Sequence, residues 1–123
     1  PDAWGQSEYF ATDVVGYVKG MWGAPLFAAE HENRTVQDAD YLQYAAWKLY
    51  SLDVQRRVLV GYYKKGSAVS SFKAMCALVG KVAQEQRGKD LILIGAPWEA
   101  EPQTPKDVRQ LFDSMIVGVF PSE

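Results

Sequence analysis

Cationic side chains are the most concentrated chemical feature of this chain of 123 residues. Nine of its thirteen Lys and Arg residues, but only two of its fifteen acidic residues, fall between Lys48 and Lys89. That segment carries a charge of about +7 and its flanks together about −9, a division that the formal net charge of −2 conceals. Such asymmetry indicates an anionic partner, most often nucleic acid. The cations of the segment are Lys48, Arg56, Arg57, Lys64, Lys65, Lys73, Lys81, Arg87 and Lys89.

Side chains suited to metal binding or nucleophilic catalysis are sparse. The single histidine, His31, stands between Glu30 and Glu32 in a polar stretch that we predict to be a loop, where solvated carboxylates are usual. A metal site needs three or four converging ligands, and one histidine with the distant Cys76 does not supply them. The chain has no nucleophile elbow, phosphate-binding glycine loop or dinucleotide fingerprint. We therefore expect no enzyme, no metal and no cofactor.

Composition bounds the class of protein. A chain of this length with 48% hydrophobic and 23% charged residues is typical of one globular domain, residues 1–123. Cys76 lies in the apolar stripe of a predicted helix, which indicates a buried, inert thiol and a reducing, cytoplasmic location. No apolar run reaches the length of a membrane span, so we expect no membrane contact.

The apolar periodicity predicts a mainly α protein, a compact bundle of about five helices with one short apolar extended segment. The helices are expected at about 7–22, 35–50, 53–65, 70–87 and 105–119, and the extended segment at about 90–95. Thr104, with Pro105 at the first helical position and Asp107 at the third, is a strong start signal for the last helix. Gly80 inside the fourth helix either costs about 1 kcal/mol or marks a turn between two shorter helices.

The basic segment resembles the helix-turn-helix of sigma-factor region 4, with a possible core at 52–89. Such domains begin with a helix that bears an Arg, a Val-Leu pair and aromatic residues and that ends in Gly and Ser. The matching residues are Arg57, Val58, Leu59, Tyr62, Tyr63, Gly66 and Ser67. The stretch Cys76–Gly80 resembles the pattern that ends the first helix of the motif, where a small residue lets two helices approach and Gly makes the turn. Residues 81–87 would then be the recognition helix.

A more particular resemblance is to the small late-gene antitermination proteins of phages, the phage 21-type Q family. The similar stretch runs from Asp38 to Gly66 and includes Leu59-Val-Gly-Tyr-Tyr-Lys-Lys-Gly66, which is comparable to the Leu-x-x-x-Tyr-Tyr-x-x-Gly segment of that family. The resemblance implies a protein that binds double-stranded DNA, engages RNA polymerase and suppresses termination of transcription.

Two hypotheses about function follow. The first is a transcription regulator whose cations neutralise phosphates while a glutamine reads a base in the major groove. Its nucleic-acid-binding residues would be Lys73, Lys81, Gln84, Arg87 and Lys89, assisted by Lys64 and Lys65. The alternative is a small helical module for protein–protein interaction, an inhibitor or adaptor, that binds through Trp4, Trp22 and Trp98. The oligomeric state stays open.

Overall fold

A mixed five-stranded β-sheet forms the centre of the molecule in a computed structural model. The structure describes residues 14–17, 25–32, 39–63, 66–97 and 104–122. The strands are β1 (Val14–Gly16), β2 (Phe27–Glu32), β3 (Arg56–Tyr63), β4 (Leu91–Pro97) and β5 (Ile116–Phe120). The helices are α2 (Ala39–Tyr50), α3 (Ala68–Ala83) and α4 (Pro105–Asp113).

The strands lie side by side in the order in which they occur in the chain. The three central strands β2, β3 and β4 are mutually parallel, whereas β1 and β5 are antiparallel edge strands. Parallel neighbours need a crossover connection, and α2 and α3 provide the two crossovers. Because the central strands are parallel, their carboxyl ends meet at one edge of the sheet.

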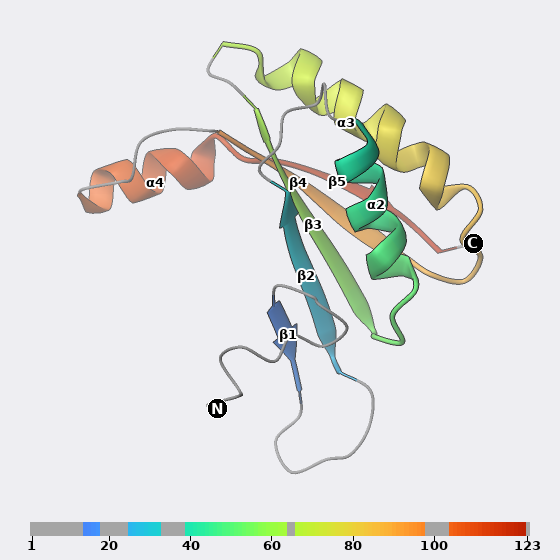
Figure 1. Cartoon of the computed structure of the whole chain (residues 1–123). Coiled ribbons are helices and arrows are strands. Elements are labelled where there is room, and N and C mark those ends of the chain that lie inside the picture. Colours follow the sequence, from blue (N-terminus) through green and yellow to red (C-terminus); the bar gives the residue numbers. More distant parts are fainter. Residues whose placement is uncertain (1–13, 18–24, 33–38, 64–65, 98–103, 123) are drawn as a thin grey trace.

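One face of the sheet is covered by α2 and α3 (Figure 1). Helix α2 packs on β2 and β3, and α3 packs on β3, β4 and β5. The face of α2 that contacts the sheet carries Leu42, Ala46 and Leu49 at helical spacing, and each is at most 4% exposed. Met75 and Val79 are the fully buried residues of α3.

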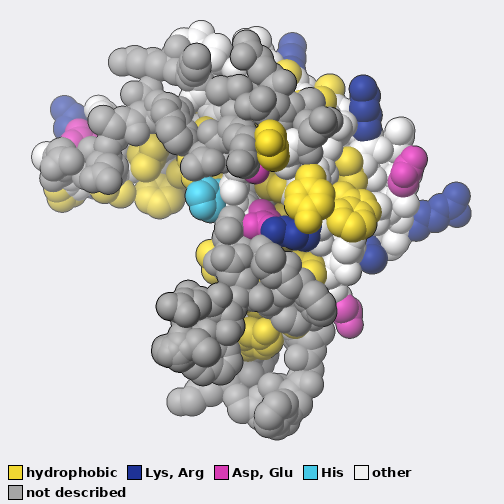
Figure 2. All heavy atoms as spheres, viewed as in Figure 1, with side chains coloured by type: hydrophobic (Ala, Val, Ile, Leu, Met, Phe, Trp, Pro, Cys, Tyr) yellow, Lys and Arg dark blue, Asp and Glu magenta, His cyan; other side chains and the backbone are white. Residues whose placement is uncertain are grey.

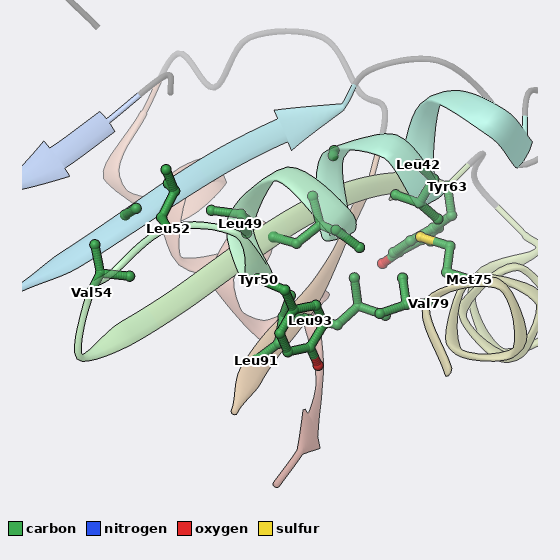
Figure 3. Close-up of a cluster of buried hydrophobic side chains, with 14 residues drawn as sticks. Leu42, Leu49, Tyr50, Leu52, Val54, Tyr63, Met75, Val79, Leu91 and Leu93 are labelled. Carbon is green, nitrogen blue, oxygen red and sulfur yellow. The ribbon is translucent and has the colours of Figure 1, made fainter. Parts of the chain in front are cut away.

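The hydrophobic core lies between the sheet and these two helices (Figure 3). Alternate residues of β3 and β4 point into this layer, so Leu59, Leu91 and Leu93 are fully buried. Gly61 also faces the layer, and a Cβ there would lie 2.5 Å from the Met75 sulfur. The absence of a side chain at position 61 therefore lets α3 approach the sheet closely.

The predicted mainly α fold is wrong, because the protein combines three described helices with a five-stranded sheet. The largest error is the third predicted helix, which the structure replaces by β3. Its supposed stripe of Val54, Val58 and Tyr62 has a spacing of four, which a helix and an alternating strand satisfy equally well. Pairing with β2 and β4 decides for the strand.

The two helices and the turn that a helix-turn-helix requires are not formed by 52–89. Residues 56–63 are a strand, and α3 continues through Gly80 without a break. The all-α description is wrong, and so is the expectation of a separate recognition helix at 81–87, since α3 ends at Ala83.

Of the other predicted elements, some are confirmed and some are wrong in part. The second helix is confirmed by α2 and the extended segment at 90–95 by β4. The last helix starts with the expected capping box at Thr104 but ends at Asp113, because 116–120 pairs with β4 as strand β5. The first predicted helix is wrong at 14–17, because 14–16 form strand β1 and Tyr17 belongs to no helix; its other positions lie outside the described residues.

The second face of the sheet is apolar and carries neither α2 nor α3. Val58, Val60, Ile92 and Ile94 lie on it and are partly exposed, and Val117 and Val119 of the edge strand are about 60% exposed. Helix α4 buries none of its residues, and it extends away from the layer that α2 and α3 form (Figure 1).

Candidate functional site

A buried ion pair joins strand β2 to helix α2. Glu30 of β2 is 4% exposed, and its carboxylate pairs with the ammonium of Lys48, which lies in the last turn of α2. The Lys48 side chain is 19% exposed, so solvent reaches the pair from the lysine side. Removing one partner from such a pair leaves an uncompensated buried charge, which is strongly destabilising.

A second carboxylate lies on the same face of β2. Glu32 follows Glu30 by two residues, and alternation along a strand directs both side chains toward the side that α2 covers. Glu32 is half-buried and is the last residue of β2. It therefore stands near the carboxyl ends of the parallel strands.

Acidic, basic and histidine side chains gather near the middle of the view in Figure 2. His31 is exposed and points to the opposite face of β2, where its ring meets that of Tyr62 edge-on with the centroids 6.2 Å apart. The expected loop is wrong for residues 30–32, which belong to the strand. Neither acid is therefore a loop carboxylate, and His31 does not join them.

The two carboxylates and the lysine could bind a divalent cation and an anionic substrate together. Carboxylate oxygens suit Mg²⁺ and Mn²⁺, and Mg²⁺ is commonly held by only one or two carboxylates together with waters and substrate phosphates. Within 14–17, 25–32, 39–63, 66–97 and 104–122, no group of three or more His, Cys, Asp or Glu residues could hold a metal ion. A cation at this site would therefore have to be held by the two carboxylates together with waters and substrate phosphates.

Other cations of the basic segment stabilise the carboxyl end of α2. Arg57 is 5% exposed, and its guanidinium donates to the carbonyl oxygens of Leu49 at 3.0 Å and Leu52 at 2.8 Å. The Lys89 ammonium donates to the Tyr50 carbonyl oxygen at 2.7 Å. Cations are favourable at this end of a helix, where carbonyl groups lack partners within the helix.

Burial governs the ionisation of two side chains at this place. It lowers the pKa of Arg57, against the raising effects of Asp90, Tyr50 and Asp53. It raises the pKa of the Tyr50 phenol, an effect that nearby Arg57 opposes and Asp90 reinforces. Both pKa shifts arise because Arg57 of β3 and Tyr50 of α2 lie in a place from which water is largely excluded.

The predicted nucleic-acid-binding residues on α3 and just after it are exposed. Lys73 and Lys81 lie on the solvent face of α3, Gln84 caps its carboxyl end, and Arg87 follows in a turn. Gln84 and Arg87 also line a shallow pocket beside Phe120. Lys89 stands apart, because it is half-buried and bonded to α2.

Five predicted binding residues lie outside the described part of the chain. They are Lys64, Lys65, Trp4, Trp22 and Trp98. Cys76 is half-buried against the core, and burial raises the pKa of its thiol, which disfavours the reactive thiolate.

The Glu30–Lys48 pair could not be recognised from the sequence. The two residues are separated by a connection and almost the whole of α2, and no spacing rule links them. Their contact exists because α2 packs back on β2. The one signal in the sequence that could have pointed to this site is local: the apolar stretch Pro25 to Ala29 is followed directly by two acidic residues separated by one residue.

Comparisons with known proteins gave no match to this chain among protein-family models, curated proteins or solved structures. Among the described residues, no helix is long and apolar enough to cross a membrane.

Proposed function

We propose that the protein hydrolyses phosphodiester bonds in nucleic acid with the help of a divalent metal ion held by Glu30 and Glu32. The observation that carries this proposal is the buried pair of Glu30 with Lys48, next to a second carboxylate on the same face of β2. Well-packed apolar residues stabilise a core as well as a buried ion pair does, or better. A pair in this position is therefore better explained by chemistry than by stability.

Each side chain has a distinct role in this proposal. A Mg²⁺ or Mn²⁺ ion, when bound, would polarise a phosphoryl oxygen and lower the pKa of an attacking water. Glu30 and Glu32 would hold that ion from the strand, a rigid element. Lys48 would stabilise negative charge that develops on the phosphoryl oxygens, because a fixed cation in a partly dehydrated place acts more strongly than one in water.

The charge of the helix layer supports an anionic substrate. Helix α3 contains Lys73 and Lys81 and no acidic residue, and both lysines are exposed. Cations along one helix attract a phosphate backbone irrespective of sequence. Binding through a helix-turn-helix is not part of this proposal, because its two helices are not formed. RNA polymerase as a partner, and a cytoplasmic location, stay predictions.

The test is a cleavage assay on labelled oligonucleotides with Mg²⁺, with Mn²⁺ and with EDTA. We expect metal-dependent cleavage that E30Q and E32Q each lower at least 100-fold, while E85Q, an exposed acid beyond α3, leaves it unchanged. The double variant E30Q/K48M removes both charges, so it should fold but not cleave. Titration of Mn²⁺ by calorimetry supplies a second readout. A wild-type protein that cleaves with neither Mg²⁺ nor Mn²⁺ would contradict the proposal.

The uncovered apolar surface favours a second candidate, a module that binds a protein. Val117 and Val119 on the second face of the sheet are 60% and 61% exposed, and Phe112 of α4 is 65% exposed. Exposed apolar patches commonly mark interaction sites. In this case V119K would abolish partner binding, whereas E30Q/K48M would leave it intact.

A further inference from the structure

Three aromatic side chains of α2 point to solvent rather than to the core. Tyr41, Tyr44 and Trp47 are 47%, 58% and 52% exposed. They recur every third residue and are therefore neighbours along the helix surface. The rings of Tyr44 and Trp47 lie 5.9 Å apart between centroids and are tilted by 30°. Aromatic rings usually contribute buried area, so three exposed rings on one short helix need a reason.

This aromatic stripe, Tyr41, Tyr44 and Trp47, adjoins the proposed site. Lys48 follows Trp47 directly and lies four residues, about one helical turn, after Tyr44. Its ammonium contacts Glu30, so the stripe leads along α2 to the carboxylates. Figure 2 shows hydrophobic side chains, a basic one and acidic ones next to one another on this view.

The neighbouring helix adds positive charge to the same layer. Helices α2 and α3 pack against each other, and the Gln43 side-chain amide of α2 donates to the Leu78 carbonyl oxygen of α3 at 3.1 Å. Lys73 and Lys81 are on the solvent side of α3. The exposed aromatic rings of α2 and the exposed lysines of α3 therefore belong to two helices that pack against each other.

We propose that the aromatic stripe is a stacking platform for unpaired bases, so that the ligand of this surface is single-stranded nucleic acid. Proteins that bind single strands combine aromatic faces with a cationic track, which is the combination found on α2 and α3. A duplex keeps its base faces inside the stack and cannot use the rings. A role for the stripe in cleavage depends on the proposed function, but binding of a single strand does not.

The binding test uses fluorescence anisotropy with a labelled 12-nucleotide oligothymidylate and with a duplex of matched length, both in EDTA so that no cleavage occurs. We expect the wild-type protein to bind the single strand at least tenfold more tightly than the duplex. Y44A/W47A should lose at least tenfold in single-strand affinity and leave duplex affinity within twofold, since each stacked base contributes substantially. W47F should retain most of the affinity.

The matched control is F112A, which removes an exposed ring from α4, far along the chain from the stripe. It should change neither affinity. Equal affinity of the wild-type protein for both ligands, no binding of the single strand, or an equal loss in F112A and Y44A/W47A would overturn the platform. Such a result, with cleavage that still depends on Glu30, would leave the proposed function standing. Single-strand binding through the rings without any metal-dependent cleavage would retain the platform and sink the proposed function.

Discussion

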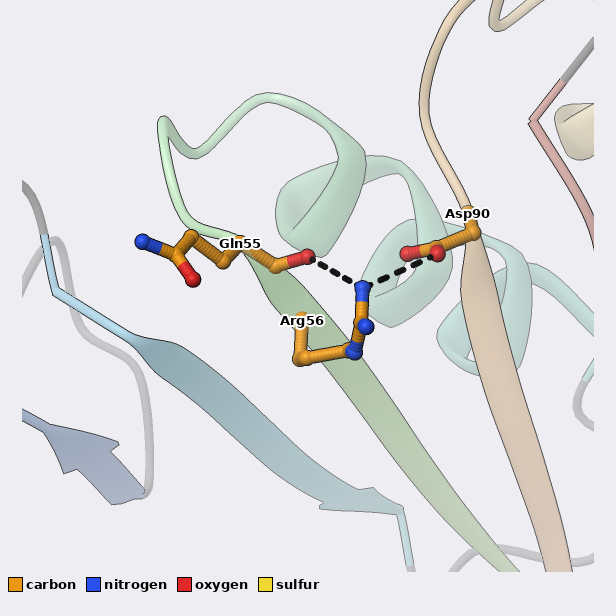
Figure 4. A network of polar contacts seen from close by, with 3 residues as sticks. All are labelled: Gln55, Arg56 and Asp90. Atoms are coloured by element: carbon orange, nitrogen blue, oxygen red, sulfur yellow. Dashed lines mark hydrogen bonds and ion pairs between the residues drawn. The ribbon is translucent and has the colours of Figure 1, made fainter.

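Arg57 has a structural role that its charge alone does not reveal. Its buried guanidinium donates to one carbonyl group in the last turn of α2, that of Leu49, and to one just beyond the helix, that of Leu52. Arg56, the preceding residue, is a contrast: its side chain is 66% exposed and lies 3.4 Å from Asp90 (Figure 4). Two adjacent arginines of one strand therefore differ because alternation sends one into the core layer and the other to the open face.

Replacement of Arg57 should destabilise the protein much more than replacement of Arg56. In R57M the Leu52 carbonyl loses the guanidinium donor, and the Leu49 carbonyl, which also accepts from the Leu52 N–H at 3.1 Å, loses one of its donors. We expect the free energy of unfolding to fall by about 2 to 4 kcal/mol. In R56M the loss should be about 0 to 1 kcal/mol, because solvent screens an exposed pair. Urea unfolding of both variants measures the difference. Similar losses in the two would contradict the assigned role of Arg57.

At the scale of elements, close packing of α3 on the sheet depends on glycines of the strands. A Cβ at Gly61 would lie 2.5 Å from the Met75 sulfur, and one at Gly95 would lie 2.7 Å from the Phe72 ring. Gly80 is different, because a Cβ there would meet the Phe120 ring at 3.6 Å, an ordinary contact, within the last turn of α3. The strand glycines thus serve packing, whereas Gly80 is neither a turn nor a close approach.

Alanine at positions 61 and 80 should therefore change stability in opposite directions. G61A overpacks the layer and should lower the free energy of unfolding by about 1 to 3 kcal/mol. G80A removes the entropic cost of a helical glycine and should raise it by up to about 1 kcal/mol. Urea unfolding again measures both. A stabilising G61A would mean that Met75 moves aside freely.

At the scale of the molecule, the fold assigns different tasks to the cations of the basic segment. Four of them are engaged within the protein, each with a partner that the structure identifies: Lys48, Arg56, Arg57 and Lys89. Lys73, Lys81 and Arg87 are exposed and remain candidates for phosphate contacts. The surplus of charge in the sequence thus overstates the number of cations that a nucleic acid would meet.

The salt dependence of oligonucleotide binding should follow the exposed lysines. Each lysine that contacts a phosphate adds about one to the slope of log affinity against log salt. In K73Q/K81Q the slope should fall by about one to two, whereas in R56Q it should not change. Anisotropy titrations between about 50 and 200 mM salt measure the slopes. An unaltered slope in K73Q/K81Q would remove α3 from the binding surface.

Local signals determined some elements without help from the rest of the chain. Thr104, Pro105 and Asp107 specify the start of α4, where the capping box forms as expected. The apolar run 91–94 is a strand because its branched side chains and flanking glycines leave few alternatives. In both cases the deciding interactions lie within a few residues of one another.

Tertiary structure alone decided the sheet and the site. Residues 56–63 and 116–120 carry patterns that a helix tolerates, and they are strands because β4 lies between them and pairs with both. Glu30 and Lys48 meet because α2 folds back over β2, a contact that no periodicity encodes. The sequence by itself determined caps, one buried strand and the concentration of positive charge. Which side chains share a site depends on pairings between distant segments, whose free energy arises only once the sheet has formed.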